Sequence, residues 1–227
     1  KVLFKILDKL NYNWANKLQH LSYGMVDLPS GKMKSREGSV VDADELISSM
    51  IDKAKVISDA LGKINDLADS EKKQLYKTIA LGALKYHILK VDPKKKILFN
   101  PEESIDFNGN TGPFVQYAYA RIKSILDKNS NTTYEFDELK LAQKEKELII
   151  LLCEFKNILN SSVKTLNPSL IANHIYEVVK LYNSYYQTHT ILGNKNINSF
   201  RVFLSEKVAI QIEKSMGLLG ISVPNRM

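Results

Sequence analysis

Apolar residues recur every three or four positions along most of this chain, which is typical of amphipathic helices packed around a shared core. One such run follows Asp42, an N-cap type of residue with Glu45 three positions later, and another begins near Ser70. Four further helices are predicted, at about 113–128, 138–160, 168–188 and 198–217. We expect Gly217 to end the last of them, since glycine favours helix C-termini. The pattern predicts a mainly α protein.

Two stretches interrupt the helical pattern. Residues 20–30 indicate a short strand and a Pro-Ser-Gly turn, and residues 97–112 are rich in turn residues. A helix, one strand and a loop cannot form a doubly wound sheet alone, so the start of the chain is expected to be the end of a larger α/β domain. The predicted divisions are a catalytic-type α/β remnant at 1–43, connecting helices and a linker at 44–111, and a helical bundle at 112–227.

The composition agrees with a soluble, folded chain. Its 227 residues are 44% hydrophobic, enough to bury a core, and the length alone fits one or two domains. No apolar run approaches the roughly 20 residues that span a bilayer, so no membrane association and a cytoplasmic location are expected. The net charge of +7 favours a polyanionic partner. The first residue is Lys1, within a helical pattern, which suggests a piece of a longer protein.

Side chains that could support independent catalysis are sparse. The single cysteine, Cys153, lies in the apolar run 148–153 and is expected to be buried and inert. The four histidines are scattered without the spacing of a metal site, so no metal is predicted. An independent enzyme is therefore disfavoured, because no nucleophile, acid–base pair or metal cluster converges in the sequence.

A basic loop follows the predicted strand. Three cations, Lys32, Lys34 and Arg36, lie within five residues between two glycines. Glycine lets backbone N–H groups approach an anion, and the cations can neutralise phosphate charge. Taken alone, the same loop could simply face solvent, as charged runs usually do.

The helix predicted from Pro113 carries two different stripes. Its core stripe is apolar, and a second stripe about 100° away combines rings with cations: Phe114, Tyr117, Arg121 and Lys128. Such a surface suits unstacked nucleic-acid bases, because rings stack on bases, arginine stacks or hydrogen-bonds, and lysine binds phosphate. The pattern equally allows the rings to pack on a neighbouring helix while Arg121 extends into solvent.

Four motifs, in order, resemble arginyl-tRNA synthetases, a family within the class I aminoacyl-tRNA synthetases. Gly-Met-Val at 24–26 precedes Gly-Lys-Met at 31–33, and Thr-Gly-Pro-Phe-Val-Gln-Tyr-Ala-Tyr-Ala-Arg occupies 111–121. Leu-Tyr-Asn-Ser-Tyr-Tyr lies at 181–186, and the chain closes with Leu-Leu-Gly and Arg-Met. The resemblance covers nearly the whole chain, and it implies an α-helical anticodon-binding domain after the end of a Rossmann-like catalytic domain.

The resemblance implies a catalytic role for the basic loop. Its signature residues here are Lys32, Met33, Lys34, Ser35 and Arg36. In the family this loop stabilises the pyrophosphate charge by electrostatics and closure, with Lys32 and Lys34 expected on the ATP phosphates. Lys34 stands at the first Ser and Ser35 at the second Lys of the class pattern Lys-Met-Ser-Lys-Ser. Whether Lys34 or Arg36 replaces the missing cation stays open.

The resemblance also implies a set of anticodon contacts: Phe114, Tyr117, Arg121, Tyr186 and Met227. Phe114 replaces the tyrosine usual at its position, so a hydroxyl contact is lost there. Tyr186 ends an apolar helical stripe that would ordinarily be core, and we expect it to be partly exposed where the helix extends beyond its neighbours. Met227 is expected to reach the anticodon site together with its carboxylate.

The implied function is that of the C-terminal part of an arginine-tRNA ligase that binds tRNA-Arg. The intact enzyme would form arginyl-adenylate from arginine and ATP, with magnesium, and transfer arginine to the tRNA. This chain alone is expected to be inactive and without a cofactor, because the N-terminal ATP and arginine site is absent. It is also expected to be a monomer. The alternative is a helical protein–protein interaction module with no tRNA role, whose aromatic stripe docks a partner helix.

Overall fold

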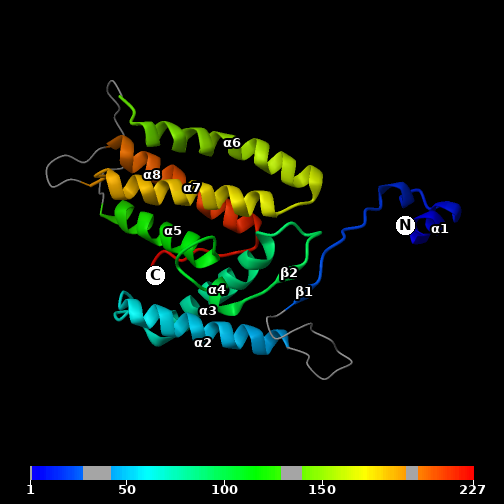
Figure 1. Ribbon diagram of the computed structural model, residues 1–227, viewed down its shortest axis with the longest axis horizontal. Helices are drawn as coiled ribbons and strands as arrows, with labels where there is room; N and C mark the ends of the chain where they lie inside the picture. The colour runs from blue at the N-terminus through cyan, green and yellow to red at the C-terminus, as the bar shows by residue number, and fades with distance from the viewer. Residues whose placement is uncertain (1, 28–41, 129–139, 193–198) are drawn as a thin grey trace.

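A computed structural model describes residues 2–27, 42–128, 140–192 and 199–227, and these residues are mainly helical (Figure 1). The helices are α1 (Val2–Lys9), the 3-10 helix η1 (Ala15–Lys17), α2 (Ala43–Leu61), α3 (Asp69–Leu89), α4 (Pro101–Ser104), α5 (Gly112–Asp127), α6 (Gln143–Thr165), α7 (Ser169–Thr188) and α8 (Ser199–Leu218). The strands are β1 (Val26–Asp27) and β2 (Ile97–Leu98). The mainly α fold predicted from the sequence is confirmed.

Side-chain caps explain where several helices begin. Asp42 accepts a hydrogen bond from the Asp44 N–H at 2.8 Å and starts α2. Thr111 accepts one from the Phe114 N–H at 3.2 Å and starts α5. These bonds satisfy N–H groups that have no partner inside the helix. The cap predicted at Asp42 is confirmed.

Three local predictions are wrong. The helix expected at about 138–160 lies instead at Gln143–Thr165. Gly217 does not end α8, which continues to Leu218, and the left-handed residue is Gly220 with a φ of +68°. The Ile221 N–H returns to the Met216 carbonyl at 2.9 Å, which closes the last turn in the manner of a Schellman cap. Cys153 is exposed, because α6 packs on its neighbours with one side and turns the other to solvent.

The bundle is formed by α5, α6, α7 and α8. In Figure 1, α6 lies on one side of α7 and α8, and α5 lies on the other. Its core contains fully buried residues from each of these helices: Ile122, Leu148, Ile175, Tyr182 and Ile212. The apolar stripes predicted from the sequence therefore meet in one shared core.

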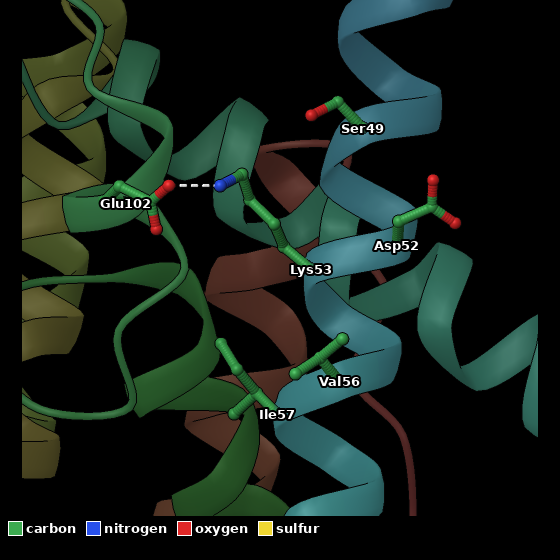
Figure 2. A pocket seen from close by; sticks show the side chains of 6 residues that line it. All are labelled: Ser49, Asp52, Lys53, Val56, Ile57 and Glu102. Atoms are coloured by element: carbon green, nitrogen blue, oxygen red, sulfur yellow. Dashed lines mark hydrogen bonds and ion pairs between the residues drawn. The ribbon is translucent and has the colours of Figure 1, made fainter.

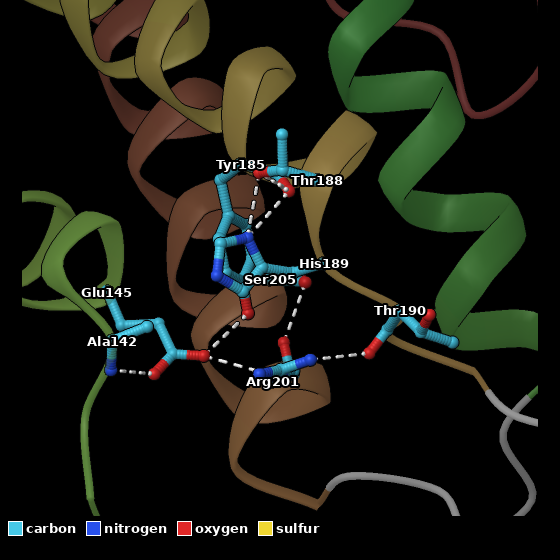
Figure 3. A network of polar contacts seen from close by, with 8 residues as sticks. All are labelled: Ala142, Glu145, Tyr185, Thr188, His189, Thr190, Arg201 and Ser205. Carbon is cyan, nitrogen blue, oxygen red and sulfur yellow. Dashed lines mark hydrogen bonds and ion pairs between the residues drawn. The ribbon is translucent and has the colours of Figure 1, made fainter.

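A buried carboxylate joins three helices at one end of this bundle (Figure 3). Glu145 of α6 is 3% exposed and accepts hydrogen bonds from Arg201 Nε at 2.9 Å and from the Tyr185 hydroxyl at 3.3 Å. Arg201 Nη1 also donates to the Thr190 carbonyl at 3.0 Å. The charge of Glu145 is thus compensated within the protein, which is what a buried carboxylate requires.

Helices α3 and α5 cross with their backbones in contact. A Cβ on Gly112 would lie 2.3 Å from the carbonyl oxygen of Gly82, so only glycine fits at this crossing. The buried Gln116 side chain donates to the Thr78 carbonyl at 3.1 Å and to the Ser222 carbonyl at 2.8 Å. These contacts fix the α2–α3 pair, the bundle and the C-terminal tail to one another.

The N-terminal part is held by a short parallel pairing that the sequence did not predict. Val26 of β1 pairs with Ile97 of β2, so the expected strand finds its partner in the linker region. Before β1 the chain extends away from the helices (Figure 1), with Val2, Leu3 and Tyr23 more than half exposed. In the described part of the chain, no helix has the length and apolar character needed to span a membrane.

Candidate nucleic-acid interface

A cavity of about 460 Å³ opens where α5, α7, the α2–α3 turn and the C-terminal tail meet. Four separate stretches of chain line it, and they contribute Lys63, Tyr117, Ala120, Arg121, Ser124, Asp127, Lys128, Tyr186, Asn225, Arg226 and Met227. Four of these side chains are cations and two are tyrosines. The lining therefore combines charge for phosphate with rings for bases.

The guanidinium of Arg121 lies between two tyrosine rings. Its carbon is 4.9 Å from the centre of the Tyr117 ring and 5.2 Å from that of Tyr186. Arg121 Nη1 donates to Asn183 Oδ1 at 3.0 Å, which fixes the plane of the group. Tyr186 is 38% exposed, although Tyr182, one turn earlier, is fully buried. The cation and the rings thus form one stacked surface that solvent can reach.

Two neighbours, Lys63 and Phe107, orient the Tyr117 side chain. Lys63 Nζ donates to the Tyr117 hydroxyl at 2.7 Å and lies 5.0 Å from the ring centre. The Phe107 ring meets the Tyr117 ring edge-on, with centres 6.0 Å apart. The hydrogen bond from Lys63 lowers the pKa of Tyr117 below its usual value, with Arg121 adding to the effect against partial burial. The Tyr117 hydroxyl therefore lies beside two positive charges, those of Lys63 and Arg121.

The C-terminal tail is held at both ends and forms one wall of the cavity. Lys85 Nζ donates to the Gly220 carbonyl at 2.6 Å, where the chain leaves α8. Arg226 makes a bidentate pair with Asp66, at 2.9 and 3.0 Å, and this contact lowers the pKa of Asp66. Met227 is only 7% exposed and packs into the core of the α2–α3 region.

Four of the five expected anticodon residues line this one cavity: Tyr117, Arg121, Tyr186 and Met227. The partial exposure expected for Tyr186 is confirmed. Phe114 is not among the lining residues; it is half-buried and packs on Tyr176 of α7, with ring centres 5.6 Å apart. For Phe114, the geometry agrees with the alternative in which a ring of this stripe packs on a neighbouring helix.

The five residues of the basic loop that are expected to be catalytic, Lys32, Met33, Lys34, Ser35 and Arg36, lie outside the described residues. Their assignment stays a prediction from the resemblance. In the described residues, no cluster of three or more histidine, cysteine or acidic side chains could hold a metal ion.

Sequence reasoning missed one residue that lines the cavity and two that hold lining residues in place. Lys63 and Asp66 lie in the turn between α2 and α3, more than 50 positions before Tyr117, and Asn183 lies on α7. The sequence marks a helix end at Gly62, whose φ is +67°, but it contains no signal for what the turn contacts. Only the packing of α3 on α5 brings the turn to the cavity.

A second cavity, of about 620 Å³, lies against the side of α2 (Figure 2). Five residues of α2 and one of α4 line it: Ser49, Asp52, Lys53, Val56, Ile57 and Glu102. The Lys53 ammonium is paired with the Glu102 carboxylate, and the lining contains no aromatic ring. This cavity therefore lacks the combination of rings and uncompensated cations that a nucleic-acid site needs.

Two family models match successive parts of the chain. The model of the DALR anticodon binding domain matches residues 115–227, and the model of the class I tRNA synthetase (R) catalytic domain matches residues 1–100. The first covers most of the cavity lining. The second covers the segment that contains Lys63 and the α2–α3 pair.

Individual relatives agree with both models. The chain is 56% identical over 229 residues to the arginine–tRNA ligase of Flavobacterium psychrophilum and 50% identical over 234 residues to that of Phocaeicola vulgatus. Both matches use 100% of this chain, which spans only 38% and 39% of the relatives' length. The solved arginyl-tRNA synthetase of Thermus thermophilus superposes with a TM-score of 0.83 at 27% identity, over 94% of this chain and 36% of that one.

Proposed function

Because the chain belongs to the arginyl-tRNA synthetase family, we propose that the cavity between α5, α7 and the C-terminal tail binds the anticodon region of tRNA-Arg. The observation that carries this proposal is the Arg121 guanidinium between Tyr117 and Tyr186. A ring and guanidinium surface of this kind accepts unstacked bases, and each stacked base contributes roughly 1–3 kcal/mol.

Each lining residue has a role that its chemistry allows. Tyr117 and Tyr186 offer ring faces, and Arg121 offers donors that can reach base edges or phosphate. Met227 forms part of the wall, and we assign it an anticodon contact as the family resemblance implies. Phe114 is included in the same set by resemblance alone; in this chain its ring packs on Tyr176.

The whole enzyme of which this chain would be a part is proposed to form arginyl-adenylate from ATP and arginine and to pass arginine to tRNA-Arg. The basic loop, with Lys32 and Lys34 on the ATP phosphates, would contribute to that step. The described residues offer no set of magnesium ligands, so we derive no step through the ion. Alone, this chain is expected to bind tRNA and to catalyse nothing.

The remaining assignments are proposals of the same kind. We propose that the catalytic remnant, the connecting helices and the anticodon-binding domain divide at about residues 43 and 111. We also propose a cytoplasmic monomer. The helical interaction module considered as an alternative has no support from the matched families.

The test compares tRNA species at several salt concentrations. Binding of the 227-residue chain to tRNA-Arg is measured by fluorescence anisotropy, beside the same tRNA with its middle anticodon base replaced. We expect tighter binding of the unaltered tRNA at every salt concentration and weaker binding of both as salt rises. Equal affinity for the two tRNAs would refute anticodon recognition.

A further inference from the structure

The turn between α2 and α3 lies outside the matched anticodon-binding model but inside the cavity wall. That model begins at residue 115, and Lys63 lines the cavity together with residues from 117 to 227. We propose that Lys63 is a nucleic-acid contact of this site that binds a backbone phosphate, so that the site extends beyond the anticodon-binding domain. This inference rests on the function proposed above and adds a residue to it.

The position of Lys63 is fixed by its neighbours in the turn. Gly62 ends α2 in the left-handed conformation, with a φ of +67°, and Ile64 is 1% exposed in the core beneath. The Leu67 N–H returns to the Ile64 carbonyl at 3.1 Å and closes the turn. The backbone at Lys63 is therefore held between a helix end and a buried residue.

The turn is also tied to the opposite wall. Asp66, three residues after Lys63, holds Arg226 of the tail by two hydrogen bonds. Figure 1 shows the C-terminus lying between α5 and the α2–α3 pair, close to the end where this turn lies. The Asp66–Arg226 pair therefore links the turn that carries Lys63 to the C-terminal tail.

The charge of Lys63 is available for an anion. Its ammonium donates to a neutral hydroxyl, that of Tyr117, at 2.7 Å. An ammonium has three donors, so two remain after this bond. Arg226, by contrast, is paired through two hydrogen bonds with the carboxylate of Asp66, which already compensates its charge. Lys63 is thus better placed than Arg226 to bind phosphate.

A phosphate is the group that fits this arrangement. Lysine acts as a compact point charge for phosphate, whereas base edges are read by planar, directional donors. A base stacked on Tyr117 would place its own backbone within reach of a cation that hydrogen-bonds the far end of the same ring. Lys63 would then strengthen binding irrespective of base identity, while Arg121 and the rings respond to the anticodon.

The experiment measures how the affinity of the 227-residue chain for tRNA-Arg changes with salt. We compare Lys63→Ala with Lys156→Ala, which removes an exposed cation from α6, a helix that contributes nothing to the cavity lining. Lys63→Ala is expected to weaken binding about fivefold and to reduce the slope of log affinity against log salt by about 0.7, as for one lost phosphate contact on a single strand. Lys156→Ala is expected to change neither.

A second pair of variants separates direct contact from an effect through Tyr117. Tyr117→Phe keeps the ring and removes the hydroxyl that Lys63 contacts. If Lys63 binds phosphate directly, Lys63→Ala lowers the salt slope by the same amount in the Tyr117→Phe background as in the wild type. If it acts only by orienting the hydroxyl, the effect of Lys63→Ala disappears in that background, and the proposal is wrong.

The outcomes also distinguish this inference from the proposed function. Equal wild-type affinity for tRNA-Arg and its middle-base variant refutes anticodon recognition whatever the lysine variants do. A wild type that discriminates, together with a Lys63→Ala variant that behaves as Lys156→Ala, overturns the role of Lys63 alone. Thermal unfolding followed by circular dichroism, with a transition like that of the wild type, establishes that each variant compared is folded.

Discussion

Two consecutive tyrosines of α7 each lie beside an arginine, and the two pairs have different purposes. The Tyr185 side chain is fully buried, and its hydroxyl joins Arg201 in binding the carboxylate of Glu145. Tyr186 is 38% exposed and lies against Arg121, which also contacts the Tyr117 ring and the side-chain amide of Asn183. The same residue types build a closed ion pair on one side of the helix and an open surface on the other.

The difference lies in how each positive charge is compensated. Arg201 is paired with the carboxylate of Glu145, whose side chain is 4% exposed. Breaking this pair is costly, because removing Arg201 would leave a buried charge without a partner. Arg121 is held by ring faces and by a neutral amide, so its charge remains available to a ligand. A charge neutralised inside the protein stabilises the fold, whereas one supported by neutral groups can serve recognition.

The largest expected effect is on the closed pair. Arg201→Met should lower the free energy of unfolding by about 3 kcal/mol, because the buried Glu145 carboxylate loses its cation. Urea denaturation followed by circular dichroism measures the loss. The double variant Glu145→Gln with Arg201→Met should recover part of it, since neither charge then remains. An Arg201→Met variant as stable as the wild type would show that this end of the bundle does not depend on the pair.

A substitution in the open surface should change tRNA binding more than stability. Arg121→Ala is expected to weaken tRNA-Arg binding by about 2 kcal/mol, roughly thirtyfold, through loss of its stacking and donors. The unfolding free energy should change by less than about 1 kcal/mol, as for exposed cation–π contacts. Anisotropy titration and urea denaturation of the same preparation separate the two quantities. A large loss of stability with unchanged affinity would place Arg121 with Arg201 among structural residues.

Two rings of the expected anticodon set, Tyr186 and Phe114, allow a narrower comparison. Tyr186→Leu should weaken tRNA-Arg binding by about 1.5 kcal/mol, the scale of one stacked base. Phe114→Leu should leave the affinity unchanged, because its ring packs on Tyr176 rather than lining the cavity. Titrations of both variants beside the wild type test this. Equal losses of affinity in the two variants would indicate that Phe114 also contacts the tRNA.

The smallest expected effect is on the pH dependence of the free energy of unfolding, and it comes from two histidines that do not line the cavity. Burial lowers the pKa of His87 and of His174, opposed in each by the hydrogen bond to a backbone carbonyl. Below about pH 6.5 these histidines bind protons in the unfolded chain but not yet in the folded chain. The free energy of unfolding is therefore highest above that pH and decreases as the pH falls. Urea denaturation from pH 7 to 5.5 measures the decline.

The matched variant for that measurement replaces both side chains with glutamine. His87→Gln with His174→Gln should flatten the profile over the same window. Both Nδ1 atoms are buried without a partner, so a proton there finds no acceptor among the described residues. A double variant whose profile matches the wild type would show that other groups control the pH dependence.

The sequence alone could predict the helices and the family, because both depend on local patterns. The cap at Asp42, the exposed end of the stripe at Tyr186 and the mainly α fold are confirmed. The predicted end of α8 is wrong. The helix is closed at Gly220 by hydrogen bonds from residues that follow it, and the presence of a glycine in the sequence does not reveal these bonds. The exposed Cys153 shows that an apolar run does not define which side of an outer helix is covered.

The site could be predicted only in part, because it is built from four distant segments. Within the motif at 111–121, Thr111 caps a helix, Gly112 permits a close crossing and Gln116 ties three segments together. Tyr117 and Arg121 line the cavity. A motif match does not distinguish between these residues. The structure shows which of them maintain the fold and which are available to a ligand.

The order of protein synthesis has a bearing on this cavity. The ribosome makes the chain from the N-terminus, so α2, α5 and α7 are available for folding well before the tail emerges. The wall formed by Asn225 and Met227, and the contact of Gln116 with the Ser222 carbonyl, can form only once these residues have left the exit tunnel. A nascent chain halted before the tail would have most of its helices but an incomplete cavity.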